Sequence, residues 1–264
     1  MASSTSEIDS NYRDAFAAFA KASGGIEKRF SGCTCFRSPI DYIEFNMAFI
    51  ENESEVSYET LQQVQDFYRE INAEWCLTVG RDPHGLFGKA TKRIEISGRT
   101  GVPEMTIKRN EANFKRPPDA LEVRIVEDLD GLEEWVATGE RGFGMPTGFM
   151  KLLVRPQALK IPGLSFLLGR DRERNKPIAT SAAFVSEGVA GVYAVSTVPA
   201  ARSRGYGEAM TAAAARLGFD GGCEVSSLQS SQMGFPIYLR IGYRHIFDFQ
   251  RWLVSRDANS VRKA

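Results

Sequence analysis

Apolar residues in the first part of the chain change between helical spacing and short continuous runs. Residues 12–21 have the pattern of a helix, and between residues 58 and 71 apolar side chains recur at helical spacing behind Ser57, a suitable N-cap. The runs 33–37, 41–50 and 74–80 have the pattern of strands. Strands and helices in this order predict an α/β or α+β layer structure.

The same kind of pattern continues after residue 120. Residues 121–127 read as a strand, and Asp128 is placed to cap a helix with Leu129, Leu132 and Val136 on its inward side. Residues 140–148 are rich in turn-forming types and precede a second helix, whose first position would suit Pro146 because that position needs no amide donor. Three strands joined by hairpin turns follow, between residues 165 and 199.

A polar, charged segment separates these two halves. Residues 110–120 include Pro117 and Pro118, and consecutive prolines neither continue a helix nor sit in a central strand. Composition on either side is that of a globular protein. The sequence therefore predicts two domains, residues 1–116 and residues 117–264.

Composition narrows the class of protein. Lys plus Arg and Asp plus Glu both total 33, so the formal net charge is zero and no global field draws the chain to nucleic acid or to an anionic membrane. The first residues lack the pattern of a secretory signal, and no apolar run approaches the roughly 20 residues of a membrane span. We expect a cytoplasmic protein that binds neither nucleic acid nor membranes.

The cysteines do not predict a metal site. Cys33 and Cys35 alternate onto one face of a strand, and His84 and His245 are the two histidines of the sequence. A zinc site needs about four ligands at suitable spacing. We interpret both cysteines as strand residues and expect no metal.

The strand that ends near Pro199 runs directly into a glycine-containing loop and then into a helix. The loop reads Arg202-Ser-Arg-Gly205-Tyr-Gly207. A helix N-terminus exposes unpaired amide donors, and glycines leave room for an anion to approach them. From spacing alone, a phosphate site and a plain tight turn are equally good interpretations. The P-loop sequence is absent, and a dinucleotide fingerprint would need a third glycine.

At this loop the sequence resembles the GNAT acyltransferase superfamily, whose pyrophosphate loop reads [RQ]-x-x-G-x-[GA]. A second family motif, N-x-x-A-x-x-[LF]-Y-x-[KR]-x-G-F, is matched about thirty residues downstream. Its positions are occupied by Ser231, Gly234, Tyr238, Gly242 and Tyr243. The resemblance covers roughly residues 120 to 254, and residues 1–116 are more weakly similar to the degenerate half of two-domain members. The resemblance implies an α/β (α+β) fold. The catalytic GNAT domain would have a mixed, splayed central sheet flanked by helices, and a smaller GNAT-like domain would precede it in the sequence.

The resemblance also implies an activity and a cosubstrate. Members transfer an acetyl group from acetyl-CoA to an acceptor amine by direct attack within a ternary complex. Here pantetheine would lie along the strand backbone, the pyrophosphate would bind the loop amides, and Tyr238 would protonate the leaving thiolate. The implied cofactor-binding residues are Val195, Ser196, Thr197, Val198, Arg202, Ser203, Arg204, Gly205, Tyr206, Gly207 and Ser231.

Several features stay open at this stage. Some members carry a glutamate base where this chain has Gly191; Tyr193, Glu224, Ser226 and Ser227 are alternatives that the sequence does not separate. A catalytically silent acyl-CoA-binding regulatory module is therefore the alternative to an enzyme.

The acceptor region would comprise residues 140–148, with an apolar wall from Phe143 and Met145, and the region around residues 245–252. A small-molecule amine is favoured over a protein acceptor. We expect residues 1–116 to cover the acceptor cleft, to pack against the catalytic half or to form a homo-oligomer interface.

Overall fold

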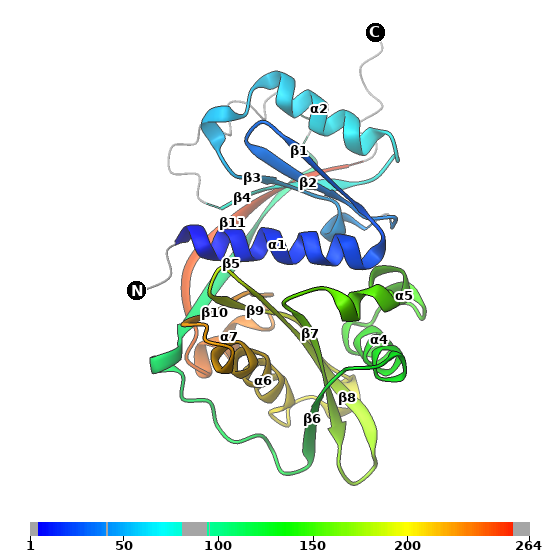
Figure 1. Ribbon diagram of the computed structural model, residues 1–264, viewed down its shortest axis with the longest axis vertical. Coiled ribbons are helices and arrows are strands. Elements are labelled where there is room, and N and C mark those ends of the chain that lie inside the picture. Colours follow the sequence, from blue (N-terminus) through cyan, green and yellow to red (C-terminus); the bar gives the residue numbers. More distant parts are fainter. Residues whose placement is uncertain (1–4, 41, 81–93, 95, 256–264) are drawn as a thin grey trace.

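The computed structural model describes residues 5–40, 42–80, 94 and 96–255. Within these ranges eleven strands form one continuous mixed sheet, in the order β1-β2-β3-β4-β11-β5-β10-β9-β8-β7-β6. Strands from both halves of the chain therefore share one sheet, and the helices pack against it (Figure 1).

The first half of the chain builds one end of this sheet. Its helix α2 (Tyr58–Arg69) begins at a capping box, in which the Ser57 hydroxyl accepts a hydrogen bond from the Thr60 amide and the Thr60 hydroxyl accepts one from the Ser57 amide. These two bonds satisfy donors that a helix N-terminus leaves free, and they confirm the predicted helix start. The other elements are α1 (Thr5–Ser23), β1 (Ile26–Phe30), β2 (Cys33–Arg37), η1 (Ile43–Phe45), β3 (Met47–Ile50) and β4 (Trp75–Val79).

The second half builds the other end of the sheet. Helix α4 (Leu129–Phe143) begins at Asp128, whose carboxylate accepts a hydrogen bond from the Gly131 amide at 2.8 Å, and it ends at Gly144 with φ of 70°. Both are ordinary helix caps. The other elements are β6 (Leu121–Ile125), α5 (Phe149–Leu153), β7 (Leu164–Asp171), β8 (Lys176–Ser186), β9 (Val189–Thr197), α6 (Tyr206–Asp220), β10 (Val225–Gln229) and α7 (Phe235–Arg240).

Two long strands join the halves. β5 (Gly98–Lys108) lies before the proline segment in sequence yet pairs with β10 and β11, and β11 (Arg244–Val254) pairs antiparallel with both β5 and β4. Figure 1 shows both strands running from one half into the other. Strands from the two sides of residue 116 are thus interleaved, and the predicted domain boundary stays a prediction.

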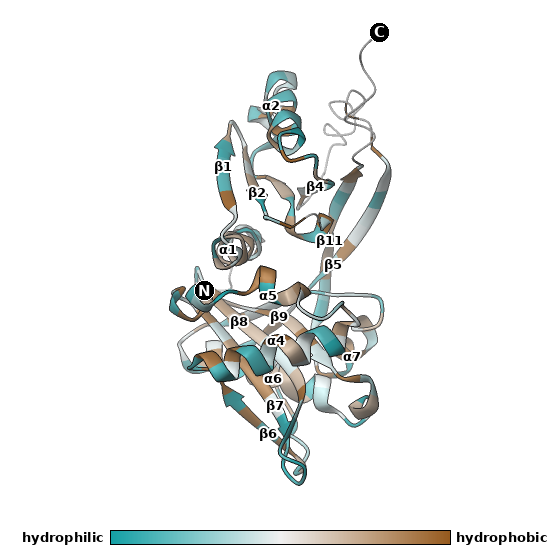
Figure 2. Cartoon of the chain, turned by 90° about the vertical axis from the view of Figure 1, so that its right-hand side faces the viewer, coloured by the Kyte–Doolittle hydropathy of each residue, from teal (hydrophilic) through white to brown (hydrophobic). Residues whose placement is uncertain are grey.

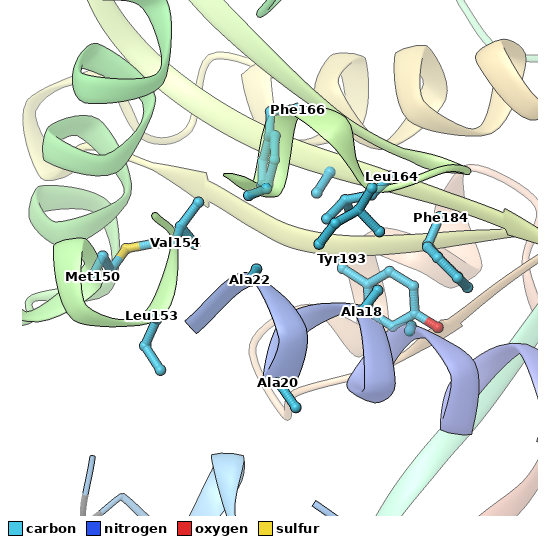
Figure 3. Close-up of a cluster of buried hydrophobic side chains, with 14 of the residues drawn as sticks. Ala18, Ala20, Ala22, Met150, Leu153, Val154, Leu164, Phe166, Phe184 and Tyr193 are labelled. Atoms are coloured by element: carbon cyan, nitrogen blue, oxygen red, sulfur yellow. The ribbon is translucent and has the colours of Figure 1, made fainter. Parts of the chain in front are cut away.

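Three apolar clusters hold the helices on the sheet. α1, α4 and α5 pack on one face over Phe166, Phe184 and Tyr193 (Figure 3), and α6 and α7 pack on the opposite face, against small residues of β8 and β9. α2 covers a third cluster that includes Trp75 and Trp252, and it is largely hydrophilic where it faces away from the sheet (Figure 2). Across the described residues, no helix has the length and apolar character that crossing a bilayer requires.

Some local expectations are wrong. Leu129 was expected on the inward side of its helix, but it is the first residue of α4 and is 55% exposed, whereas Leu132 and Val136 are buried. Residues 140–143 continue α4 instead of turning. Helix α5 begins at Phe149, so Pro146 lies in the connecting turn, where its carbonyl accepts a hydrogen bond from the Phe149 amide.

No element was predicted for residues 98–108, which form the strand β5 although a proline is unusual in a central strand. Pro103 lies one residue beyond the last β5–β10 pair, which is Glu104 with Gln229. Its carbonyl accepts a hydrogen bond from the Ser230 amide just after β10 ends. The missing N–H of Pro103 therefore interrupts no ladder bond to β10.

Candidate functional site

The neighbouring parallel strands β9 and β10 separate part of the way along their length. Their ladder consists of Val189 with Val225, Ala190 with Ser226 and Gly191 with Ser227, although β9 continues to Thr197. Beyond the ladder, Ala194 has φ of 50°, and the register between β8 and β9 shifts at this point. Such a bulge bends a strand away from its partner.

A cavity of about 840 Å³ lies where the two strands part. Its walls include the end of β9, the turn after β10 and residues of α7. Residues from the first half of the chain line it as well, among them Tyr12, Phe16 and Glu44. The splayed sheet that the sequence led us to expect is thus present, and it is open at this cavity.

The backbone of the predicted pantetheine segment divides into two sets. The Val198 amide donates a hydrogen bond to the Ile178 carbonyl of β8 at 2.9 Å. Because backbone groups alternate in direction along a strand, those of Ser196 and Val198 face β8, and those of Val195 and Thr197 face the open edge. Of the four residues named from the sequence, Val195 and Thr197 are therefore the two placed to bond a ligand through the backbone.

The glycine loop lies at the end of β9 and leads into α6. Gly205 is the N-cap of α6 with φ of 78°, and Ser203 also has a positive φ, 62°. The first amides of a helix have no partner within it, so this turn presents free donors. Arg202 is held by two bonds from its guanidinium, to the Thr197 carbonyl at 3.2 Å and to the Gly142 carbonyl of α4 at 2.8 Å.

Glycine is required by the backbone conformation at only one of the two loop positions, 205 and 207. Gly205 adopts a left-handed backbone conformation that favours glycine. Gly207 does not, and a side chain added there would meet no atom closer than the Thr197 hydroxyl oxygen at 3.9 Å. Packing within the protein therefore does not require glycine at position 207. Between them, Tyr206 is buried at 4% exposure, whereas Arg204 is exposed.

Tyr238 and Ser231 both line the large cavity. Burial raises the pKa of the Tyr238 phenol to about 12, although the neighbouring Thr211 hydroxyl lowers it somewhat. The phenol therefore stays protonated across the neutral range. The Ser231 hydroxyl accepts a hydrogen bond from the Gly234 amide at 3.1 Å and caps the turn that leads into α7.

The position where some family members carry a base is filled by other groups. A Cβ atom added at Gly191 would lie 2.3 Å from the side-chain oxygen Oδ1 of Asn11 and 2.5 Å from the Tyr193 ring. The Tyr193 hydroxyl donates to that Asn11 oxygen at 3.1 Å, and burial raises the pKa of Tyr193 well above its usual value. Glycine is thus needed at position 191 because a helix α1 side chain occupies the space.

The remaining candidates for a base differ in exposure. The Ser226 hydroxyl is bonded to the Ala190 carbonyl and to the Tyr243 hydroxyl, each close to 2.8 Å. Ser227 is buried beside Gly191 in the register of the sheet, and Glu224 is exposed and lies 3.9 Å from Arg109. The structure leaves the assignment of a base among these residues open.

Sequence reasoning missed the carboxyl group of Glu104 on β5. This side chain is fully buried, and its Oε2 accepts a hydrogen bond from the side-chain Nε2 of Gln229 at 2.7 Å, while Oε1 has no hydrogen-bond partner among the described residues. Burial raises its pKa well above the usual value, and Gln229 itself lines the large cavity. The signal that could have found it is that Glu104 is the one acidic residue between residues 98 and 108.

The proline segment is a second feature that the sequence did not connect with the site. Lys115, Arg116 and Pro118 line a cavity of about 200 Å³ whose other wall includes Gly205 and Glu208 at the start of α6. The segment thus contacts the outer side of the glycine loop. Lys115 and Arg116 line this cavity together with Gly205, and Arg116 is ion-paired with Asp119 at 3.1 Å.

The other expectations concern residues away from these cavities. Cys33 and Cys35 lie in β2 with their sulfur atoms 3.7 Å apart, as strand residues. In the part of the chain that the structure describes, no group of three His, Cys, Asp or Glu side chains is arranged to hold a metal ion. His245 bonds Asp248 at 2.8 Å, and from the predicted acceptor region around residues 245–252 it is Arg251 that lines the large cavity.

Comparison with models of protein families gives no match for this chain, and comparison with curated proteins gives none either. Solved structures do match. A GCN5-related N-acetyltransferase from Kribbella flavida superposes with a TM-score of 0.68 at 17% identity, over 91% of this chain and 94% of that one. A GCN5-related N-acetyltransferase from Sphaerobacter thermophilus gives 0.59 at 13% identity, over 86% and 81%.

A tandem GNAT protein from the clavulanic acid biosynthesis pathway also matches, with a TM-score of 0.58 at 8% identity over 85% of this chain and 78% of that one. These matches extend over both halves of the chain. The expected fold class is therefore confirmed: a mixed α+β GNAT fold with helices flanking a splayed sheet, in a two-domain arrangement. Because the sequence identities are 17% or lower, these matches show that the chains share a fold.

Proposed function

We propose that this chain is an N-acyltransferase that moves an acetyl group from acetyl-CoA to the amine of a small molecule. The observation that carries the proposal is the parting of β9 and β10 beside a helix N-terminus that lacks side chains at its glycines. Pantetheine would add to the open edge of β9 at Val195 and Thr197, as a further strand adds to a sheet. The pyrophosphate would take the free amides from Arg202 to Gly207.

The reaction would proceed by direct attack of the amine on the thioester carbon. The carbon–nitrogen bond forms, the carbon–sulfur bond breaks, and the thiolate takes the proton of the Tyr238 hydroxyl. The developing oxyanion would accept a hydrogen bond from the Val195 amide. The amine loses its proton through groups that the structure leaves open, and Tyr238 is reprotonated by solvent.

Replacing the proposed acid tests this assignment. In assays of thiol release from acetyl-CoA with a panel of amines, Tyr238→Phe should lower kcat by about 100-fold to 10,000-fold. Coenzyme A should still raise the thermal unfolding temperature of the variant, because the phosphate site is intact. Because the pKa of Tyr238 is about 12, the parent rate should show no alkaline loss from this group up to about pH 10.

Tyr58→Phe provides the control, since Tyr58 is the first residue of α2, is 43% exposed and lines none of the cavities described. Its turnover should equal that of the parent. Equal losses in both variants would contradict the role of Tyr238 as the acid.

The second candidate function is a silent acyl-CoA-binding module, and Gly191 is the observation that favours it, because a carboxylate stands at this position in some family members. Both candidates predict that coenzyme A stabilises the fold. Thiol release with any amine selects the enzyme. Stabilisation by coenzyme A without thiol release across a broad amine panel selects the silent module.

A further inference from the structure

A second cavity, of about 250 Å³, lies on the α1, α4 and α5 side of the sheet. We call it the apolar cavity. Its walls come from both halves of the chain: α1, the segment around η1, α4, and α5 with the turn before it. The lining residues are Phe16, Phe19, Tyr42, Glu44, Phe45, Trp135, Phe143, Met145, Met150, Leu153, Val154, Tyr193 and Ala194.

Aromatic rings dominate this lining. Phe19 packs edge to face on Tyr193 with ring centroids 5.7 Å apart, and Tyr42 lies 5.8 Å from Phe45. Aromatic rings favour such offset and edge contacts with another ring, and methionine sulfur also packs well against ring edges. Pockets for drug-sized ligands start at about 300 Å³, so the apolar cavity fits a single ring with a short chain.

The apolar cavity borders the large cavity at the bulge of β9. Five residues line both: Phe16, Glu44, Phe143, Tyr193 and Ala194. α6 and α7, which carry the glycine loop and Tyr238, pack on the opposite face of the sheet. A group seated in the apolar cavity would therefore reach the bulge from the face of the sheet opposite α6 and α7.

We infer that the apolar cavity holds the aromatic ring of the acceptor, so that the acceptor class is small arylalkyl primary amines. The inference rests on the proposed function, in which the thioester carbonyl lies at the bulge beside Val195. A ring held among these side chains places an amine on a two-carbon or similar chain at the junction of the two cavities. The acyl group of the donor then reacts at that junction.

The Glu44 carboxylate lines both cavities, and its side chain is 49% exposed and ion-paired with Arg251 at 2.7 Å. Arg251 lines the large cavity too, so the pair adds no net charge there. The carboxylate oxygens have further acceptor positions for the N–H groups of an amine. Because Phe16, Phe19, Tyr42 and Glu44 belong to the first half, that half would take part in selecting the acceptor.

Two adjacent leucines give a matched pair for the test. Leu153 lines the apolar cavity and is 5% exposed (Figure 3), whereas its neighbour Leu152 in α5 is 49% exposed.

With acetyl-CoA, kcat/KM for 2-phenylethylamine should exceed that for ethylamine by about tenfold or more. Leu153→Trp fills the cavity and should remove this preference, because kcat/KM for 2-phenylethylamine falls to about the value for ethylamine. Leu152→Trp should behave as the parent.

Phe143→Ala guards against a folding defect in Leu153→Trp, because Phe143 lines the apolar cavity yet is 45% exposed. It should lower the preference for 2-phenylethylamine severalfold. No preference in the parent, or an unchanged preference in both variants, overturns the inference. So does a Leu153→Trp variant that slows hexanoyl-CoA but not 2-phenylethylamine, because the cavity would then hold the acyl chain.

A binding measurement separates this inference from the proposed function. Calorimetric titration of 2-phenylethylamine into the protein with coenzyme A should show binding in the parent and in Leu152→Trp, and its loss in Leu153→Trp. If no amine releases thiol, the proposed function fails, and this binding pattern still supports the aromatic site. Absent binding, or equal binding in Leu153→Trp, contradicts the site.

Discussion

At the scale of single residues, Glu104 is a buried carboxyl group whose charged form is unfavourable in the folded protein. A carboxylate buried with one oxygen unpaired is unfavourable, and the folded protein responds by holding its proton more tightly. Gln229 supplies one hydrogen bond, and Asp9 adds a further raising effect on the pKa of Glu104. Since the folded pKa lies above the unfolded value, this group's contribution to stability is complete below the unfolded pKa. It is lost as pH rises through the folded pKa.

Glu104→Gln should therefore be more stable than the parent at neutral and mildly alkaline pH, by about 1–3 kcal/mol. The amide keeps an acceptor for Gln229 and carries no charge. The difference should shrink as pH falls toward the usual glutamate value, where the parent carboxyl is protonated in both states. Urea unfolding at several pH values measures this directly.

Glu224→Gln is the control, because Glu224 is 61% exposed on the adjoining strand end. It should leave the pH dependence of unfolding unchanged. If Glu104→Gln has the same free energy of unfolding as the parent at every pH, burial of the Glu104 carboxyl does not destabilise the folded protein.

At the scale of elements, the start of α6 is where we propose that the pyrophosphate binds. Gly205 is required by its backbone conformation, so a variant there combines strain with any loss of binding. Gly207 is free of that ambiguity, since a side chain there would have room in the unliganded protein. Its replacement therefore tests phosphate access by itself.

Gly207→Val should weaken coenzyme A binding by at least about tenfold, because the side chain stands between the anion and the free amides. The thermal unfolding temperature without ligand should stay the same or rise slightly, since glycine is a poor residue within a helix. Calorimetry gives the affinity, and a thermal melt gives the stability. Gly221→Val, at the C-cap of the same helix, should leave the affinity unchanged. If Gly207→Val binds coenzyme A as tightly as the parent does, the assignment of this loop as the pyrophosphate site is wrong.

At the scale of the whole molecule, β11 ties the two halves into one sheet. Its final residues pair with β4, and its earlier residues pair with β5. Arg251 adds a side-chain link, since its guanidinium bonds both Glu44 and the Tyr12 hydroxyl of α1. We therefore expect the halves to unfold together.

Trp252→Ala tests this coupling. Trp252 is 6% exposed, belongs to β11 and packs in the cluster beneath α2, so its loss should cost about 3–5 kcal/mol of stability. Circular dichroism and the loss of coenzyme A binding should report one shared transition, shifted to lower denaturant concentration. Ile246→Ala, on the same strand but 41% exposed, should shift it little. Separate transitions for the two signals would show that the halves are independent.

Local signals accounted for the parts of the fold that depend on neighbours in sequence. Ser57 and Asp128 cap the predicted helices, and the loop from Arg202 to Gly207 lies between a strand and a helix as expected. No prediction was made for β5, and the place of Pro103 in it becomes clear only once the end of β10 is known. Leu129 was misplaced because helical spacing does not say where the first turn faces solvent.

The sequence by itself predicted a layered structure of strands and helices from local periodicity, and its resemblance to a family singled out the glycine loop and Tyr238, because both signals consist of residue types at short, regular spacing. Only the tertiary structure decided that α1 occupies the space beside Gly191, that Glu104 is buried behind Gln229, and that both halves line the apolar cavity. These features join residues more than 100 positions apart, and no local pattern records which distant segments a sheet brings together.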